Sequence, residues 1–323
     1  MKHLSIFAFS FLLFACQPSQ NENLVQVSTM GTSGTIKYIT EKPIDFQKEI
    51  DSLLLDVNMS LSTYIDSSTI SRHNQNPLDL SISDAHFQKN FIVSKRVFLE
   101  TNSAFNPAIM PLVAYWKVQN KSENSFDLKP DSLLIDSLVQ FINHQDLITK
   151  TLDFSALAKG YGVDLVANFL ESKGITNFMV EIGGEVNCKG KNINGEYWNI
   201  GIEEPNEAER NIFEVVHIKN VSMATSGNYR NFKILDSGQK IVHIINPKTG
   251  YPEMSQLLSA SIIANNCMEA DAYATACMVM GVDTCFDFIL KMPNLECYLL
   301  YSDENGKIQK KYSPGFEQYL NKE

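Results

Sequence analysis

Apolar residues recur three and four positions apart in several segments, which places them on one face of an α-helix. These patterns predict helices over residues 45–57, 134–142 and 155–173, and residues 269–280 are predicted as a further helix. Pro130 and Asp131 precede the second segment as a typical helix start, and Gly174 follows the third as a typical helix end. We therefore expect amphipathic helices that pack one face against a core.

Other segments alternate apolar and polar residues, which is the pattern of a half-buried strand. The first predicted strand covers residues 178–182. Further strands are predicted over residues 197–202, 213–218, 232–235, 241–245, 258–264 and 297–301. Asp236-Ser237-Gly238 predicts a hairpin between two of them. Hairpin-connected strands with interspersed helices favour an α+β fold of mixed or antiparallel strands over a doubly wound sheet. No linker interrupts the chain after residue 30, so a single domain is expected.

The N-terminus has the pattern of a targeting segment. An apolar run from Leu4 to Phe14 follows Lys2 and His3, and it is too short to cross the ~30 Å hydrocarbon core of a membrane. We predict a signal peptide over residues 1–15. Leu13-Phe14-Ala15-Cys16 resembles a bacterial lipobox, which implies cleavage before Cys16 and acylation of its thiol.

An ordinary secretory signal with an incidental cysteine is the alternative to a lipid anchor. Residues 16–26 are largely polar and lack periodicity, so they are predicted to be a flexible tether. Residues 27–323 are then expected to form the folded domain, attached to a membrane through Cys16.

Composition narrows the classes of partner. The chain has 323 residues, of which 44% are apolar, so it can bury a substantial core. Its net charge is −10 and it has no basic stripe, so nucleic acid is not expected as a partner. An acidic protein that handles a phosphorylated ligand needs local cations, and a metal ion would supply them.

Five cysteines follow Cys16, at positions 188, 267, 277, 285 and 297. No Cys-x-x-Cys or Cys/His ligand spacing appears, so a zinc site is unsupported. Cys277 and Cys285 stand in apolar stretches and are expected to be buried packing residues. One disulfide would be compatible with an oxidising compartment, but the sequence leaves the pair open.

Oxygen ligands carry the candidate chemistry. Asp271 and Thr275 are four residues apart and share one face of the predicted helix 269–280. A carboxylate and a hydroxyl at one place are hard donors that suit Mg²⁺, which usually keeps positions open for substrate phosphates. The alternative is structural: Asp271 stabilises the helix N-terminus, and the Thr275 hydroxyl bonds back to a carbonyl.

Lys159 and His243 are further candidates. Lys159 lies in the first turns of a helix that is otherwise small and apolar there, where an ammonium would strengthen anion binding. A surface lysine that extends to solvent is the alternative. His243 ends a strand before a Pro/Gly turn and could accept a proton, or it could be a hydrogen-bonded core histidine. Neither a G-x-G-x-x-G loop nor a Walker A sequence is present.

Short segments in a fixed order make the sequence recognisable. They are Met30-Gly31-Thr32, Ser62-Thr63-Tyr64, Ser71-Arg72-His73-Asn74, Ala104-Phe105-Asn106-Pro107, Pro111-Leu112-Val113 with Trp116, Ala158-Lys159-Gly160-Tyr161, Glu181-Ile182-Gly183-Gly184-Glu185, the stretch from Ala224 to Arg230, the stretch from His243 to Gly250, and Ala270-Asp271-Ala272. This order resembles the ApbE family of FAD:protein FMN transferases over nearly the whole mature chain.

The resemblance implies a function and a site. It implies Mg²⁺-dependent transfer of the FMN moiety of FAD to a Ser/Thr hydroxyl of an acceptor protein, with release of AMP. The implied metal ligands are Asp271, Thr275 and the carbonyl of Ala156. The implied FAD contacts are Met30, Tyr64, Ala104, Phe105, Asn106, Asp153, Lys159 and Ile245. Aromatic rings at Tyr64 and Phe105 would suit a flavin.

The family further implies an acceptor that is the flavoprotein subunit of a membrane redox complex, and a position in the cell envelope facing the periplasm. We hypothesise that His243 either accepts the proton of the attacking hydroxyl or orients that hydroxyl through a hydrogen bond. An FAD pyrophosphatase that releases FMN and AMP, and a non-catalytic flavin-binding lipoprotein, are the alternative functions.

The chain departs from the family pattern at a few positions. Asn106 and Asn246 stand where aspartate is usual, and Ala108 stands where threonine is usual. Residues 117–120 replace an expected glycine-rich stretch. Asparagine keeps the shape of aspartate but removes its charge. We therefore expect altered recognition at the rim of the site near residues 105–120, together with altered acceptor specificity. The segments that contain Asp271 and Lys159 keep the family pattern.

Overall fold

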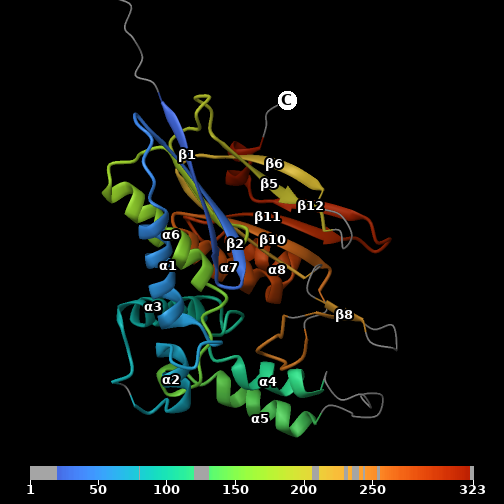
Figure 1. Cartoon of the computed structure of the whole chain (residues 1–323). Coiled ribbons are helices and arrows are strands. Elements are labelled where there is room, and N and C mark those ends of the chain that lie inside the picture. The colour runs from blue at the N-terminus through green and yellow to red at the C-terminus, as the bar shows by residue number, and fades with distance from the viewer. Residues whose placement is uncertain are drawn as a thin grey trace, which may run out of the picture.

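An eight-stranded sheet forms the centre of the computed structural model (Figure 1). The structure describes residues 20–79, 81–119, 131–205, 211–228, 232–234, 240–242, 244–252 and 255–320. In spatial order the strands are β1 (Asn21–Thr29), β2 (Thr32–Thr40), β3 (Phe178–Ile182), β4 (Glu185–Lys189), β7 (Val221–Gly227), β10 (Leu257–Ala264), β11 (Glu296–Ser302) and β12 (Ile308–Tyr312). Each neighbouring pair is antiparallel, which with the packed helices confirms the α+β fold.

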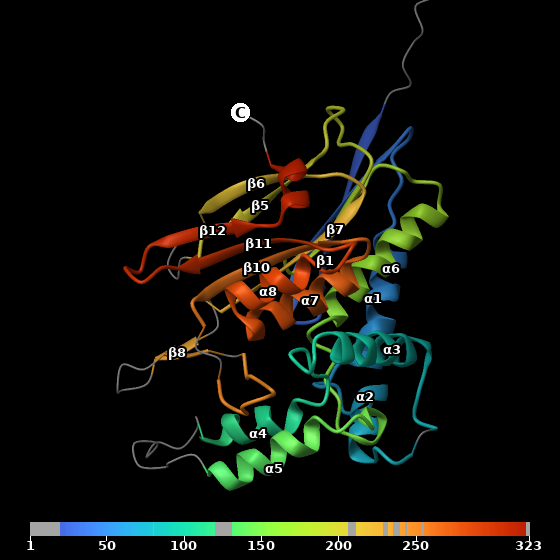
Figure 2. The ribbon, with the colours of Figure 1, turned by 180° about the vertical axis from the view of Figure 1, so that it is seen from behind.

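The two faces of the sheet are covered differently (Figures 1 and 2). Helices α1 (Gln47–Leu61), α6 (Ala158–Ser172) and α7 (Cys267–Met280) pack on one face. The hairpin of β5 (Trp198–Glu203) and β6 (Ile212–Ile218), with the 3₁₀-helix η2 (Pro314–Tyr319), covers the other. The remaining elements are α2 (Thr69–Gln75), α3 (Ala85–Glu100), α4 (Met110–Gln119), α5 (Ser132–Ile142), η1 (Leu147–Thr149), β8 (Phe232–Ile234), β9 (Lys240–Val242) and α8 (Val282–Ile289).

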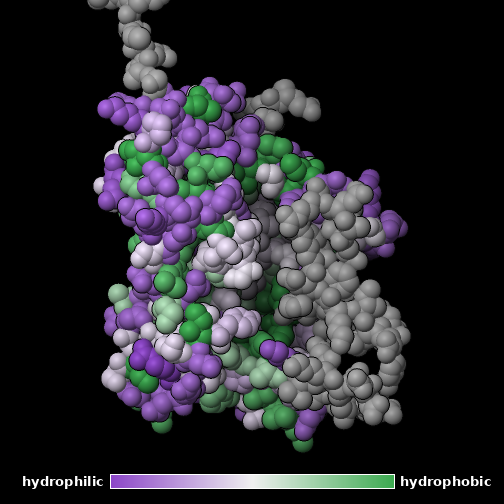
Figure 3. All heavy atoms as spheres, in the orientation of Figure 1, coloured by the Kyte–Doolittle hydropathy of each residue, from purple (hydrophilic) through white to green (hydrophobic). Residues whose placement is uncertain are grey.

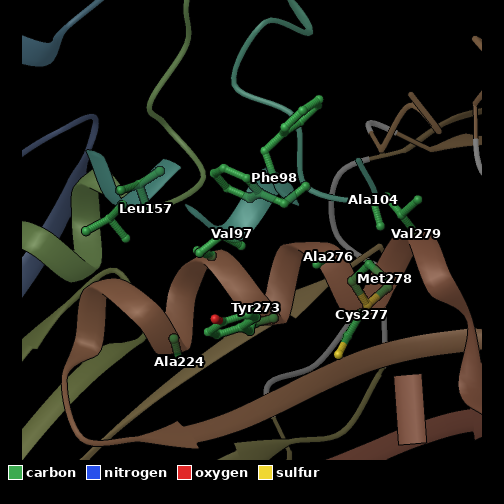
Figure 4. Packing of buried hydrophobic residues seen from close by; sticks show 14 of the residues in the cluster. Val97, Phe98, Ala104, Leu157, Ala224, Tyr273, Ala276, Cys277, Met278 and Val279 are labelled. Carbon is green, nitrogen blue, oxygen red and sulfur yellow. The ribbon is translucent and has the colours of Figure 1, made fainter. Parts of the chain in front are cut away.

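Helix α7 is the central element of the core. It lies between β7 and β10 of the sheet and α3, and its side chains are buried on nearly every side (Figure 4). Tyr273 and Met278 are 1% exposed, and Asp271 is 2% exposed. A helix enclosed in this way needs small and apolar residues all round, which explains why the apolar residues of this segment do not form a single stripe.

Most predicted elements are confirmed. Residues 134–142 and 269–280 lie in α5 and α7, residues 47–57 of the predicted helix 45–57 lie in α1, and the predicted strand 178–182 is β3. The other predicted strands match β5, β6, β8, β9, β10 and β11, although β9 ends at Val242 and the turn residues 236–238 lie outside the described residues.

Two predicted boundaries are wrong. Helix α6 begins at Ala158 instead of residue 155, because residues 155–157 form the turn that brings α6 onto α7. The predicted tether 16–26 extends too far, because residues 21–26 belong to β1 and pair with β2. The second half of β1 does alternate, with Val25 and Val27 buried and Gln26 and Ser28 exposed, so this strand pattern was overlooked.

The cysteines are buried. Cys277 and Cys285 form a disulfide between α7 and α8, with a Cα–Cα distance of 4.9 Å, so they cross-link the chain as well as filling space. Cys188, Cys267 and Cys297 are free. Across the described ranges, no helix is long and apolar enough to cross a membrane.

Helices α6 and α7 approach each other closely at Gly160. A Cβ on Gly160 would lie 2.3 Å from the carbonyl oxygen of Cys267 and 2.8 Å from the backbone nitrogen of Met268. These are backbone atoms, so the contact could only be relieved by moving one helix.

We predict that Gly160→Ala destabilises the fold. Alanine ordinarily stabilises a helix by about 1 kcal/mol relative to glycine, but overpacking costs about 1–3 kcal/mol, and here the clash involves backbone. Urea denaturation should show a net loss of stability, whereas Asn168→Ala, on the exposed side of α6, should change it little. An increase in stability for Gly160→Ala would contradict the described packing.

Asp164 holds the start of α7. Its carboxylate accepts hydrogen bonds from the backbone N–H groups of Cys267 (2.8 Å) and Met268 (2.9 Å). Burial raises the pKa of this carboxyl to about 6, although both hydrogen bonds act in the opposite direction. The folded state therefore binds the Asp164 proton more tightly than the unfolded chain, and this contribution to stability is lost as the pH rises through about 6.

We predict that Asp164→Asn changes the pH dependence of stability. Asparagine cannot ionise, so its free energy of unfolding relative to the parent protein should rise by about 2 kcal/mol between pH 4.5 and pH 7.5. Urea denaturation at the two pH values measures this difference. A difference that stays constant with pH would show that Asp164 has an ordinary pKa.

Candidate functional site

Three charged side chains meet where α6, α7 and β4 converge. The Lys159 ammonium nitrogen lies 3.0 Å from Glu185 Oε1 and 3.6 Å from Asp271 Oδ2. The side chains of Glu185 and Asp271 are 4% and 3% exposed, whereas that of Lys159 is 28% exposed. Lys159 thus joins two buried carboxylates and remains open to solvent on one side.

The start of α6 positions this cluster. The backbone N–H of Gly160 donates to Asp271 Oδ2 at 3.1 Å. Among the described residues, no backbone N–H donates to the carbonyl of Ala156, one turn before Gly160. A helix N-terminus, an ammonium and a buried carboxylate therefore share one small volume.

The electrostatics of the three groups are linked. Burial alone would lower the pKa of the Lys159 ammonium, but Asp271 and Glu185 raise it above its ordinary value, so Lys159 stays charged. Burial raises the pKa of the Asp271 carboxyl, and Lys159 acts against this shift. For Glu185, burial and then the Asp271 charge raise the pKa. Because two carboxylates face one ammonium, the cluster favours a further cation.

The predicted metal donors lie in suitable places. Within the described part of the chain, the contacts of Asp271 with Gly160 and Lys159 both use Oδ2, which leaves Oδ1 for another cation. Thr275 is half-buried one turn further along α7, with its hydroxyl 3.3 Å from that of Ser226. Carboxylate, hydroxyl and backbone carbonyl oxygens are ligands that Mg²⁺ accepts, so the residues fit such an ion. Over the described ranges, no group of three His, Cys, Asp or Glu side chains forms a metal site by itself.

A cavity opens beside the cluster. Its volume is about 430 Å³, and Figure 3 shows a hollow near the centre of this face of the molecule. The cavity is lined by Met30, Gly31, Val57, Asn58, Leu61, Ser62, Thr63, Tyr64, Asp153, Ser155, Ala158 and Lys159. Tyr64 is 91% exposed at this cavity, so one ring is free to stack against a planar ligand.

The predicted FAD contacts divide into two groups. Met30, Tyr64, Asp153 and Lys159 line the cavity together. Ala104, Phe105, Asn106 and Ile245 are absent from its lining, which is drawn from described residues only. Phe105 is 2% exposed in the hydrophobic core, and Ala104 packs close to Val279 (Figure 4). The core encloses the Phe105 ring in this structure, and its implied contact with FAD stays a prediction.

Asn106 and Asn246 have definite structural roles. The Asn106 side-chain amide donates to the Ile142 carbonyl (3.3 Å) and to Asn143 Oδ1 (3.2 Å), which ties its loop to the end of α5. An aspartate could not donate either bond, so asparagine suits this environment. Asn246 Oδ1 accepts from the backbone N–H of Lys248 at 2.9 Å, a turn contact that aspartate could also make.

Some functional candidates were missed from the sequence. Glu185 was noticed only as part of a motif, and Asn58 and Ser155 were not considered at all. Glu185 Oε2 is buried and has no hydrogen-bond partner among the described residues. The one available signal was a glutamate directly after Gly183 and Gly184, at the start of a strand. His243 and Cys16 lie outside the described residues, so their predicted roles remain predictions.

Comparisons with known proteins identify the family. The model of the ApbE family matches residues 30–299. The chain is 34% identical to the FAD:protein FMN transferase of Haemophilus influenzae, over 95% of this chain and 94% of that protein. It is 36% identical to the FAD:protein FMN transferase of Vibrio cholerae, over 84% of this chain and 85% of that protein.

Solved structures show the same fold. The flavin transferase ApbE from Vibrio cholerae superimposes with a TM-score of 0.79 at 31% sequence identity. The match covers 94% of this chain and 100% of that chain. The ApbE protein from Thermotoga maritima, at 23% identity and a TM-score of 0.75, supports the fold alone. Because the family model spans most of the chain and relatives above 30% identity cover nearly all of it, the chain belongs to the ApbE family.

Proposed function

We propose that this protein transfers the FMN moiety of FAD to a Ser/Thr hydroxyl of an acceptor protein and releases AMP. The observation that carries the proposal is Lys159, held by two buried carboxylates at the edge of a cavity of about 430 Å³. That cavity offers apolar and aromatic surface at Met30 and Tyr64 for a flavin, and a cation beside it for a pyrophosphate. The curated relatives are named for this reaction.

We further propose that Asp271, Thr275 and the Ala156 carbonyl hold a Mg²⁺ ion. When bound, such an ion would neutralise charge on the pyrophosphate and on the departing AMP. Asp271 Oδ1 and the Ala156 carbonyl support this assignment, since neither oxygen accepts a hydrogen bond from the residues that the structure describes.

The protein's own residues then have separate tasks. The Lys159 ammonium contacts the pyrophosphate oxygens, and Glu185 fixes its position from the buried side. The cavity walls orient the flavin and exclude water from the FMN-side phosphorus. The acceptor hydroxyl oxygen attacks that phosphorus, the bond from phosphorus to the AMP oxygen breaks, and the hydroxyl proton passes to a base, which we propose to be His243.

The cellular setting is also a proposal. A lipobox-like sequence ending at Cys16 supports a lipid anchor, and an anchored signal-peptide-bearing protein would face the periplasm. The acceptor would then be an envelope protein, and the family resemblance supports the flavoprotein subunit of a membrane redox complex.

The direct test is incubation of the protein with FAD, Mg²⁺ and candidate acceptor proteins from the same cell envelope. We expect covalent flavin fluorescence on an acceptor, with one AMP released for each flavin attached. Free FMN with an unlabelled acceptor would support FAD hydrolysis instead, and unchanged FAD would support binding alone.

We predict that transfer depends on Mg²⁺ through Thr275. EDTA should abolish turnover, and Thr275→Val should raise the Mg²⁺ concentration needed for half-maximal rate by about tenfold, since one ligand bond is lost. Thr225→Val is the matched control, because Thr225 is a half-buried threonine whose hydroxyl contacts a serine, Ser261, at 2.7 Å. Turnover that resists EDTA would refute the metal assignment.

A further inference from the structure

The sheet has two ends, and the candidate site occupies only one of them. The turn between β1 and β2, at Met30 and Gly31, lines the cavity. At the opposite end, Asn21 pairs with Thr40, so β1 begins where β2 finishes. Figure 1 shows this second end at the top of the molecule, where β1 begins.

Four loops join into one surface at this second end: residues 40–43, 173–177, 189–197 and 219–220. The Asn21 amide donates to the Glu41 carbonyl (2.9 Å), and the Ile39 N–H donates to the Asn177 carbonyl (2.9 Å). Asn177 Oδ1 accepts from the Lys191 N–H (2.8 Å).

The last loop joins the same surface. The Gly190 N–H donates to Asn220 Oδ1 at 2.8 Å. These bonds hold the loops side by side, so their exposed side chains form a continuous patch.

This patch carries exposed lysines. We name Lys42, Lys173, Lys191 and Lys219 the lysine surface; all four are exposed, and the same loops contain only Glu41 and Glu196 as acidic residues. The ammonium groups of Lys191 and Lys219 lie 5.7 Å and 5.4 Å from the ring centroid of Tyr197. A local excess of cations is notable because the whole chain carries a net charge of −10.

Exposed aliphatic side chains stand beside these lysines. Ile44 follows the first loop and is 44% exposed, and Ile193 in the third loop is 38% exposed. Lysines together with exposed aliphatic and aromatic residues are typical of a surface that rests on a membrane interface.

The sequence before β1 limits how far this end can be from a lipid anchor. Only five residue steps separate Cys16 from Asn21, the first residue of β1. A fully extended chain spans at most about 3.6 Å per residue, so Asn21 must lie within about 18 Å of Cys16. An acylated Cys16 would therefore hold the lysine surface near the membrane.

We propose that the lysine surface docks on anionic phospholipid headgroups and fixes the orientation of the protein on the membrane. The proposal rests on acylation of Cys16 and not on the FMN-transferase reaction. Each lysine close to an anionic leaflet favours the docked orientation by about fivefold. The eight residue steps from Asn21 to Thr29 along β1 then place the cavity up to about 26 Å further from the membrane, at about 3.3 Å per step. The acceptor hydroxyl would have to be presented at that height.

The test uses the acylated full-length protein on vesicles of phosphatidylglycerol and phosphatidylcholine with spin-labelled headgroups. A fluorophore is attached at Asn194→Cys, beside the lysine surface, or at Ser28→Cys, an exposed position near the other end of β1. The free cysteines are buried, so labelling is selective. We expect strong quenching at position 194 and little at position 28.

Charge variants separate docking from simple tethering. The combined variant Lys173→Gln, Lys191→Gln and Lys219→Gln should lower the ratio of docked to undocked protein about 100-fold. A control variant with Lys95→Gln, Lys117→Gln and Lys307→Gln removes the same charge from exposed positions elsewhere and should leave quenching at position 194 unchanged.

Three results would overturn the proposal. They are equal quenching at positions 194 and 28, quenching at 194 that survives neutralisation of the lysine surface, and a mass for the membrane-extracted protein that shows no acyl group. Transfer of FMN by detergent-dispersed protein is measured separately, so loss of membrane orientation and loss of the proposed activity remain distinguishable.

Discussion

The structure depends on one buried interaction, the Lys159 ammonium shared between the carboxylates of Glu185 and Asp271. Moving an ion from water into a protein interior costs several kcal/mol, so a buried carboxylate requires a partner. Lys159 comes from α6, Asp271 from α7 and Glu185 from β4. These three elements must therefore meet at one point. The absence of a side chain at Gly160 and the Asp164 contact with the start of α7 make that meeting possible.

The same interaction leaves an excess of negative charge, which explains how a net-acidic protein could recruit a metal ion for a phosphorylated ligand. One ammonium faces two carboxylates, and one oxygen of each carboxylate has no contact with Lys159. The cavity then extends from this polar point toward Met30 and Tyr64, which are apolar and aromatic. FAD has a charged pyrophosphate and a flat apolar flavin ring, so it matches a cavity that is charged at one end and apolar and aromatic at the other.

Much of the fold follows from local patterns, and the rest does not. Helix α1 and strand β3 were predictable because each buries one face, so that periodicity is visible. Strands β1 and β2 and helix α3 were not identified. Helix α7 was predicted as a helix, but its burial on nearly all sides was not predicted. A helix buried in this way has no polar stripe that would show which side faces solvent. The order of strands depends on contacts between distant segments, such as β4 with β7, which a single sequence does not reveal.

The site shows the same division. Asp271 and Thr275 are four residues apart in one helix, so their common face could be inferred from spacing alone. Glu185 is far from both in sequence and has meaning only after β4 is placed beside α6. Phe105 shows the opposite limit, because a recognised motif implies a ligand contact for this residue but gives no sign that its ring lies in the core.

The single-turnover rate of FMN transfer measures whether the Lys159 ammonium acts on the pyrophosphate. Lys159→Gln keeps a polar side chain with hydrogen-bond donors but removes the positive charge, and Lys95→Gln removes a charge from the exposed side of α3. This role of Lys159 predicts a fall of about 100-fold for Lys159→Gln, measured well below the lowered unfolding midpoint that loss of the buried ion pair causes, and an unchanged rate for Lys95→Gln. A Lys159→Gln rate within a factor of about two of the parent protein would contradict it.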